Sequence, residues 1–223
     1  MKNKEVIIAP SILAANFLKL EEELKTLNQL NSKNDLWLHL DIMDGHFVPN
    51  LTFGAPLVQA MKQIFKGHCD AHLMVTNPQF HLDWLQMLKI DHVTFHWETV
   101  THHDRFISEI KKRFGSVGVV LNPSTPLSVI PTYLLNKIDV LLLMTVNPGF
   151  AGQSFIEGVL SKIKQADELR TKDGHHYQIQ IDGGVTPDNS QKLIEAGADI
   201  LVVGSALFHA KITYQEVISK LKH

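Results

Sequence analysis

Short apolar runs rich in β-branched residues alternate with longer helical patterns along the whole chain, and this alternation constrains the fold most. The apolar runs occupy residues 6–10, 37–42, 69–75, 92–96, 117–121, 140–145, 178–181 and 200–203. Helical patterns lie at residues 17–30, 55–65, 78–88, 103–114, 128–135, 155–170, 187–196 and 214–221. Eight units in 223 residues give about 28 residues per unit, which is the spacing of a (β/α)8 barrel.

A doubly wound open sheet shares this alternation and is the main alternative. Such a sheet concentrates its polar site residues at one switch point, and its dinucleotide-binding forms carry Gly-x-Gly-x-x-Gly after the first strand. Here that fingerprint is missing, and polar residues follow many different strands. The sequence therefore predicts the α/β class, with one single-domain (β/α)8 TIM barrel over residues 1–223 and the chemistry at the carboxyl ends of its strands.

Composition limits the partners and the compartment. The chain is 44% hydrophobic and 20% charged, with a net charge of −2, so we expect neither a nucleic-acid surface nor a membrane surface. An uncharged run at residues 114–136 contains three prolines, which argues against a membrane-spanning helix. The basic start is followed by an apolar stretch that Pro10 and Ser11 interrupt, which is unlike a signal peptide. Because Cys69 is the single cysteine, we expect a reducing, cytoplasmic location.

The densest group of chemically active residues lies at strand ends. His39 and Asp41 are two positions apart, so on a strand they share one face, and His72 stands on the next predicted strand. Asp182 ends the seventh strand, and in a barrel all four side chains can meet at the mouth. Two imidazoles and two carboxylates suit Zn²⁺, Fe²⁺, Co²⁺ or Mn²⁺. The alternative is that each histidine is a hydrogen-bonded core residue.

Other strand ends carry glycines, methionines and one aromatic–acid pair. Glycine-rich loops follow the sixth, seventh and eighth strands at residues 147–153, 183–184 and 204–205, where backbone N–H groups can bind a phosphate. Three methionines at or near strand ends read by themselves as core packing: Met43, Met74 and Met144. Trp97 and Glu98 after His96 either contribute to the mouth or pack in the core. Ser11, after the first strand, either faces a ligand or caps the next helix.

Six segments taken together resemble the ribulose-phosphate 3-epimerase family. They are residues 9–13 (APSIL), 39–51 (HLDIMDGHFVPNL), 72–75 (HLMV), 144–153 (MTVNPGFAGQ), 182–184 (DGG) and 204–205 (GS). They occur in order along the chain, and the match runs from the first strand to the last helix and so spans nearly the whole sequence. The resemblance implies a (β/α)8 barrel enzyme, an isomerase of carbohydrate metabolism. That enzyme interconverts D-ribulose 5-phosphate and D-xylulose 5-phosphate at C3 in the pentose phosphate pathway, through an ene-diolate.

The resemblance also implies roles for individual residues. His39, Asp41, His72 and Asp182 would bind one divalent metal ion, with Zn²⁺ favoured over Fe²⁺, Mn²⁺ or Co²⁺, and Asp41 and Asp182 would be the catalytic acid/base pair. The implied substrate-binding residues are Ser11, His72, Met43, Met74, Met144, Gly149, Phe150, Ala151, Gly152, Gly183, Gly184, Gly204 and Ser205. Ala151 departs from the usual Gly-Phe-Gly-Gly pattern, and an added methyl disfavours positive φ there. A homo-oligomer is expected, as in the family.

Three other functions compete with this hypothesis. Ala151 resembles the related D-allulose-6-phosphate 3-epimerases, which would use the same mechanism on a six-carbon ketose phosphate. Decarboxylases that share this barrel need a lysine within Asp-x-Lys-x-x-Asp, whereas the corresponding strand here reads HLMVT at residues 72–76. An inactive phosphosugar-binding protein would lack a metal-binding residue or a catalytic acid, whereas all four predicted metal-binding residues, the two aspartates included, are present here.

Overall fold

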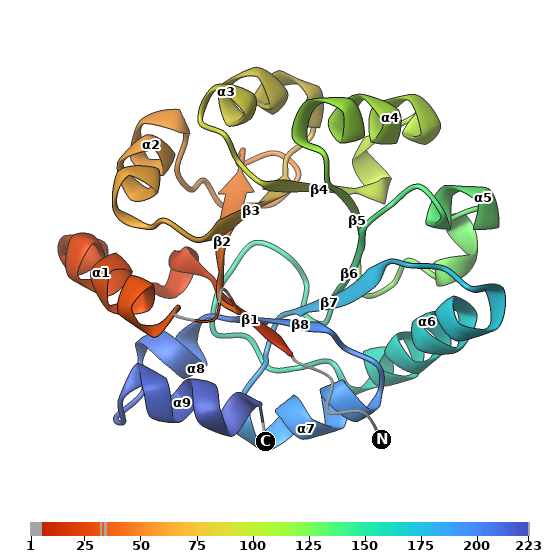
Figure 1. Ribbon diagram of the computed structural model, residues 1–223. Helices are drawn as coiled ribbons and strands as arrows, with labels where there is room; N and C mark the ends of the chain where they lie inside the picture. Colours follow the sequence, from red (N-terminus) through yellow and green to blue (C-terminus); the bar gives the residue numbers. More distant parts are fainter. Residues whose placement is uncertain (1–5, 32, 34, 223) are drawn as a thin grey trace.

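Eight parallel strands form one sheet that closes into a barrel, as Figure 1 shows in a view along its axis. The computed structural model describes residues 6–31, 33 and 35–222. The strands are β1 (Ile7–Pro10), β2 (Trp37–Met43), β3 (His68–Met74), β4 (His92–His96), β5 (Val117–Leu121), β6 (Val140–Met144), β7 (Gln178–Asp182) and β8 (Ile200–Val203). Two isolated parallel bridges between β1 and β2, Ile8 with Leu36 and Ser11 with His39, complete the ring. The predicted (β/α)8 barrel and its eight strands are confirmed.

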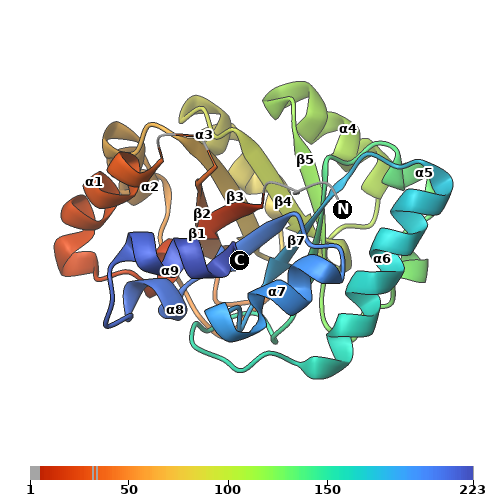
Figure 2. The same cartoon turned by 60° about the horizontal axis from the view of Figure 1, so that its bottom comes forward.

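Helices surround the strands on the outside (Figures 1 and 2). They are α1 (Leu20–Leu30), α2 (Ala55–Ile64), α3 (Leu82–Met87), α4 (His103–Phe114), α5 (Thr132–Leu135), α6 (Leu160–Asp173), α7 (Pro187–Glu195), α8 (Ser205–Phe208) and α9 (Tyr214–Leu221). Each predicted helical pattern overlaps one of them, with α6 running three residues beyond its pattern, and four of the patterns also overlap a 3₁₀ turn. Only α8 was not predicted, because four residues are too few to show a helical period.

Helix boundaries follow local chemistry. Pro187 opens α7 behind the cap Thr186, whose backbone N–H donates to the Asn189 side chain at 2.9 Å. Gly197 follows the same helix with φ +116°, the region that glycine adopts most easily. None of the helices in the described part of the chain is long and apolar enough to cross a bilayer. The basic start of the chain lies outside the described residues.

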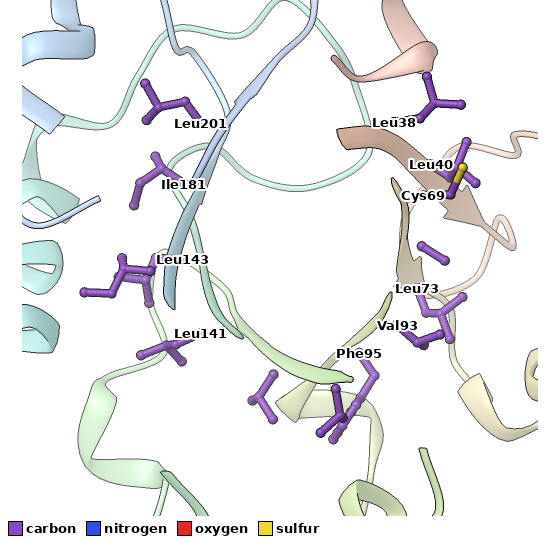
Figure 3. Close-up of a cluster of buried hydrophobic side chains, with 14 of the residues drawn as sticks. Leu38, Leu40, Cys69, Leu73, Val93, Phe95, Leu141, Leu143, Ile181 and Leu201 are labelled. Carbon is purple, nitrogen blue, oxygen red and sulfur yellow. The ribbon is translucent and has the colours of Figure 1, made fainter. Parts of the chain in front are cut away.

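The apolar core lies between the strands and the helices rather than along the barrel axis. Figure 3 shows Leu38, Leu40, Leu73, Val93 and Phe95 pointing away from the barrel centre, and all five are fully buried. Burying one such side chain stabilises the fold by about 1.5–3 kcal/mol. Because side chains alternate along a strand, the intervening residues point into the barrel.

The barrel interior is divided into an apolar part and a polar part. Val120, Leu142 and Met144 pack together inside β5 and β6. The inward positions of β2, β3, β4 and β7 carry buried polar side chains, namely His39, Asp41, Asp70, His72, His92, Thr94, His96 and Gln180. Burying this many polar groups is costly unless they pair with one another. The fold therefore brings polar groups from β2, β3 and β4 together with those of β7 across the barrel interior.

Candidate active site

Strand register brings the four predicted ligands together. Asp41 on β2 is paired with His72 on β3, and His39 precedes Asp41 on the same face of β2. Asp182 ends β7, where the backbone N–H of Thr145 donates to its carbonyl oxygen at 2.7 Å. The Thr52 hydroxyl donates to the carbonyl oxygen of Asp41 at 2.6 Å. The backbone of each aspartate is therefore held by a residue outside its own strand.

One atom from each of the four side chains faces a common point. His39 Nε2 lies 3.3 Å from Asp41 Oδ1 and 3.6 Å from Asp182 Oδ2. His72 Nδ1 lies 3.2 Å from Asp41 Oδ1 and 3.3 Å from Asp182 Oδ2. In a tetrahedral zinc site with bonds of about 2.0–2.1 Å, neighbouring ligand atoms are about 3.3–3.4 Å apart. The four spacings fit a single small cation.

Electrostatics inside this cluster favour charged groups of both signs. Burial by itself would lower the pKa of His39, but the charges of Asp41 and Asp70 raise it well above its ordinary value. The pKa of His72 is also raised, with burial opposed by Asp182 and Asp41. Burial would raise the pKa of Asp41 and of Asp182, and the two histidines lower both. A divalent cation can replace the protons that the imidazoles otherwise hold.

An unpartnered ring nitrogen in the cluster is a second indication that these residues fit a metal ion. His39 Nε2 is buried and makes no hydrogen bond, although it points into the cluster. A buried ring nitrogen without a partner is costly, and a cation at this point would satisfy it. His39, Asp41, His72 and Asp182 together form a group that could hold one metal ion.

His39 is held from behind by a carboxylate. Its Nδ1 lies 2.8 Å from Asp70 Oδ2, which also accepts a hydrogen bond of 2.7 Å from the Gln180 side chain. Metal-binding histidines commonly donate their second N–H in this way. Asp70 and Gln180 are not among the residues predicted from the sequence. Each stands two positions before a predicted ligand, His72 or Asp182, and this spacing was the available signal.

His72 has a different partner on its far side. Its Nε2 lies 2.9 Å from Nε2 of His96, and His96 Nδ1 lies 3.4 Å from Glu98 Oε2. Burial lowers the pKa of His96 to about 4. Trp97 stacks on His103 and packs against the outer core, so of the two readings for this residue the core reading is correct.

The remaining predicted residues line one cavity of about 320 Å³, within the usual range for small-molecule sites. Its walls include Ser11, Asp41, Met43, Met74, Met144, Gly149, Phe150, Ala151, Gly152, Asp182, Gly183, Gly184, Gly204 and Ser205. Ser11 donates to Asp41 Oδ2 at 2.5 Å. His39 and His72 are fully buried behind this surface. The structure thus brings together every predicted site residue, and it adds wall residues that were not predicted, such as Leu13, Val146 and Gln153.

The segment between β6 and α6 forms one wall of the cavity, and in Figure 1 it crosses the ring of strands. Gly149 and Gly152 have φ of +124° and +75°. Among the described residues Lys89 is the only non-glycine residue with positive φ, so Ala151 lies in an ordinary backbone region. The methyl group therefore causes no strain, and the strain expected at Ala151 is absent. Asn50 donates to the Gly149 carbonyl oxygen at 2.8 Å and links this segment to the loop after β2.

Comparison with known proteins identifies the family. The model of the ribulose-phosphate 3 epimerase family matches residues 7–208. The chain belongs to the ribulose-phosphate 3-epimerase family. It is 38% identical over 220 residues to the ribulose-phosphate 3-epimerase of Escherichia coli K12, with 98% of this chain and 96% of that protein covered. It is 39% identical to the Synechocystis ribulose-phosphate 3-epimerase, with 99% and 95% covered. This member of the family is therefore an epimerase.

Solved structures of other barrel enzymes share the fold. The 3-hexulose-6-phosphate synthase of Salmonella typhimurium superposes with a TM-score of 0.67 at 18% identity, with 97% of each chain covered. The orotidine 5′-phosphate decarboxylase of Pyrococcus horikoshii superposes with a TM-score of 0.64 at 12% identity, with 97% of this chain and all of that one covered. At these identities the likeness concerns the barrel alone.

Proposed function

We propose that this epimerase interconverts D-ribulose 5-phosphate and D-xylulose 5-phosphate at C3, as a step of the pentose phosphate pathway. The observation that carries the proposal is the pair of carboxylates, Asp41 and Asp182, that face one cavity from two separate strands. In the barrel β1 and β8 lie between β2 and β7, so the two carboxylates reach the cavity from different directions. Membership of the family and the names of its relatives support the substrate.

Inversion at C3 explains why two carboxylates are needed. The C3 proton is α to a ketone, so a carboxylate can remove it and leave an ene-diolate. Returning the proton to the opposite face inverts the centre, and one carboxylate cannot reach both faces. In each direction one carboxylate takes the C3 proton as the base, while the other, which must carry a proton, returns one to the opposite face. The two histidines lower the pKa of both Asp41 and Asp182, which favours the ionised form that the base needs. The Ser11 hydroxyl orients the second oxygen of Asp41 through its hydrogen bond.

A divalent ion held by His39, Asp41, His72 and Asp182 would act as a Lewis acid for negative charge on the substrate oxygens. Within the protein, Asp70 fixes the ring of His39 and His96 contacts the far nitrogen of His72. The buried histidines close the base of the cavity, and Met43, Met74 and Met144 cover its inner wall. These methionines exclude water from the reacting carbons. We propose Zn²⁺, with Fe²⁺, Mn²⁺ or Co²⁺ as alternatives, because this donor set suits all four.

The phosphate group would bind at the glycine-rich wall of the cavity. Gly183, Gly184, Gly204 and Ser205 lie there together, and none of the residues described around the cavity carries a lysine or arginine side chain. Backbone N–H groups would therefore supply most of the hydrogen bonds to the phosphate. A Cβ atom at Gly184 would come within 2.4 Å of the Phe155 backbone nitrogen, so the close packing of this loop depends on glycine.

A coupled assay of D-ribulose 5-phosphate epimerisation, before and after chelation and with metal add-back, tests this function. Loss of activity on chelation and its return with one ion are expected. Elemental analysis of the chelated sample shows whether any residual activity comes from retained metal. Activity in a sample shown to be metal-free would contradict metal dependence.

The six-carbon alternative is tested by the same assay on D-allulose 6-phosphate. One extra carbon changes the distance between the reacting carbon and the phosphate while leaving the acid/base chemistry unchanged. We expect the higher kcat/KM for the five-carbon sugar, and a clear preference for allulose 6-phosphate would overturn the assignment. Homo-oligomerisation and a cytoplasmic location stay predictions from the sequence.

A further inference from the structure

The far nitrogen of His72 contacts a second histidine. His72 Nδ1 faces Asp41 and Asp182, whereas its Nε2 lies 2.9 Å from Nε2 of His96. Both imidazoles are fully buried, and their rings are nearly parallel, with centroids 5.1 Å apart. Phe47 packs against the His96 ring at 4.6 Å. At this nitrogen–nitrogen distance only one proton fits between the rings, so one nitrogen donates and the other accepts.

Metal binding by His72 decides which nitrogen donates. A histidine binds a cation through an unprotonated ring nitrogen, so a neutral His72 that uses Nδ1 must carry its proton on Nε2. His72 Nε2 then donates to His96 Nε2, which must be unprotonated. The proton of a neutral His96 therefore lies on Nδ1. The reverse arrangement would place a proton on His72 Nδ1 and block the cation.

Glu98 is placed to favour the arrangement in which His72 Nε2 donates to His96 Nε2. Its Oε2 lies 3.4 Å from His96 Nδ1. Its Oε1 already accepts hydrogen bonds from the Asn122 backbone N–H at 3.0 Å and from the Thr125 hydroxyl. An ionised carboxylate only accepts hydrogen bonds, so it stabilises the form of His96 that carries its proton on Nδ1. Burial acts to raise the pKa of Glu98, but the neighbouring His96 and hydrogen bonds from Thr125 and Asn122 lower it to about 2.

We propose that His96 and Glu98 are positioning residues that fix the tautomer of His72, so that its Nδ1 presents a lone pair to the metal. This inference rests on the proposed metal site and deepens it. The two ligand histidines are then held in different ways. His39 reaches a carboxylate directly through Asp70, whereas His72 reaches one through an intervening imidazole. Partners of this kind typically affect metal affinity by about 10–100-fold.

Titration of the metal-free protein with Co²⁺ tests the proposal, because bound Co²⁺ reports ligand geometry in its visible absorption spectrum. The decisive variant is Glu98→Gln, because the Glu98 side chain is 23% exposed and glutamine keeps an oxygen for Asn122. Glutamine can also offer N–H groups to His96, so it no longer selects one tautomer. We expect Co²⁺ to bind about tenfold more weakly, with an altered spectrum. The melting temperature of the metal-free protein should stay unchanged.

A double-mutant cycle separates the relay from a through-space charge effect. If Glu98 acts through His96, adding Glu98→Gln to His96→Leu should cause no further loss of Co²⁺ affinity, whereas additive losses would overturn the relay. His96→Gln, which keeps an acceptor for His72, should recover part of the affinity lost in His96→Leu. Glu109→Gln, which removes a carboxylate that pairs with Arg113 on α4, is the matched control and should bind Co²⁺ normally.

The outcomes separate this inference from the proposed function. Normal Co²⁺ affinity and an unchanged spectrum in Glu98→Gln would overturn the relay while leaving the metal site intact. A wild-type protein that binds no Co²⁺, Zn²⁺, Mn²⁺ or Fe²⁺ would overturn the metal site itself, and the relay with it.

Discussion

Asp182 offers the sharpest test at the scale of single residues, because its carboxylate lies both in the metal cluster and in the cavity wall. Asparagine keeps an oxygen that can face the cation but cannot accept the C3 proton. We therefore expect Asp182→Asn to lower kcat by about 10²–10⁴-fold. Exchange of the C3 proton with solvent through Asp41 alone should persist. NMR of the substrate in D₂O measures this exchange separately from epimerisation.

The matched control is Asp188→Asn, an exposed carboxylate in the first turn of α7, which should keep normal turnover. Metal content has to be measured for both variants, so that loss of the cation is not mistaken for loss of the acid. Full turnover by a metal-loaded Asp182→Asn protein would remove Asp182 from the acid/base pair.

At the scale of elements, Asp44 holds the loop that follows β2. Its Oδ1 accepts from the backbone N–H groups of His46 at 2.8 Å and Phe47 at 2.9 Å, and its Oδ2 accepts from Thr76 at 2.7 Å. Burial acts to raise its pKa, but these bonds lower it from 3.8 to about 2. A carboxyl group with a lowered folded-state pKa stabilises the fold above its ordinary pKa. This contribution is lost as the pH falls towards the folded-state value.

Asp44→Asn should therefore lower the free energy of unfolding by about 1–2 kcal/mol at neutral pH. The difference from the wild type should shrink as the pH falls from about 5 towards 3, because the carboxyl group is then protonated in the unfolded chain while it is still ionised in the folded one. Urea unfolding across this range measures it. Asp83→Asn, at an exposed carboxylate, is the control. A difference that stayed constant with pH would show that the charge of Asp44 does not contribute.

The loop after β8 gives a second prediction at this scale. A Cβ atom at Gly204 would lie 3.2 Å from the Ala14 methyl group, so a large side chain has no space behind the loop and must enter the cavity. Gly204→Trp should raise KM by about tenfold or more, equivalent to about 1.4 kcal/mol of lost binding. Metal content should stay unchanged. Lys211→Trp, at an exposed position after α8, controls for the bulk of the indole. An unchanged KM would count against phosphate binding at this loop.

The regular elements could be predicted because each leaves a periodic mark in the sequence. Leu24 and Leu27 mark the buried face of α1, and the bounds predicted for α9 agree with the structure. The strands were visible as apolar runs because their outward residues pack under helices. The elements that could not be predicted are short ones, namely α8 and the 3₁₀ turns. They depend on neighbouring packing and caps rather than on a repeating pattern.

At the scale of the whole molecule, the cluster itself was predicted, whereas the partners of its supporting residues could not be read from spacing. His39 and Asp41 are two positions apart on one strand and share its face, so their spacing alone placed them together. The Gln180 side chain contacts Asp70, 110 positions earlier in the chain, and this contact exists only because the barrel closes. The partnership of His72 with His96 likewise depends on the pairing of β3 with β4. Sequence spacing identifies groups on one strand, and closure of the barrel determines their partners.

Closure also makes the metal site a link between distant parts of the chain, since its ligands come from β2, β3 and β7. A cation that binds only the folded chain adds about 2.7 kcal/mol of stability at one hundred times its Kd. For a protein of this size each kcal/mol of unfolding free energy changes Tm by about 2–4 °C. Chelation should therefore lower Tm by about 5–10 °C, and adding the metal back should restore it. Calorimetry with and without chelator measures this. For His39→Gln, which lacks one ligand, chelation and add-back should leave Tm unchanged. Equal Tm values for metal-loaded and metal-free wild-type protein would show that the cation contributes nothing to holding these strands together.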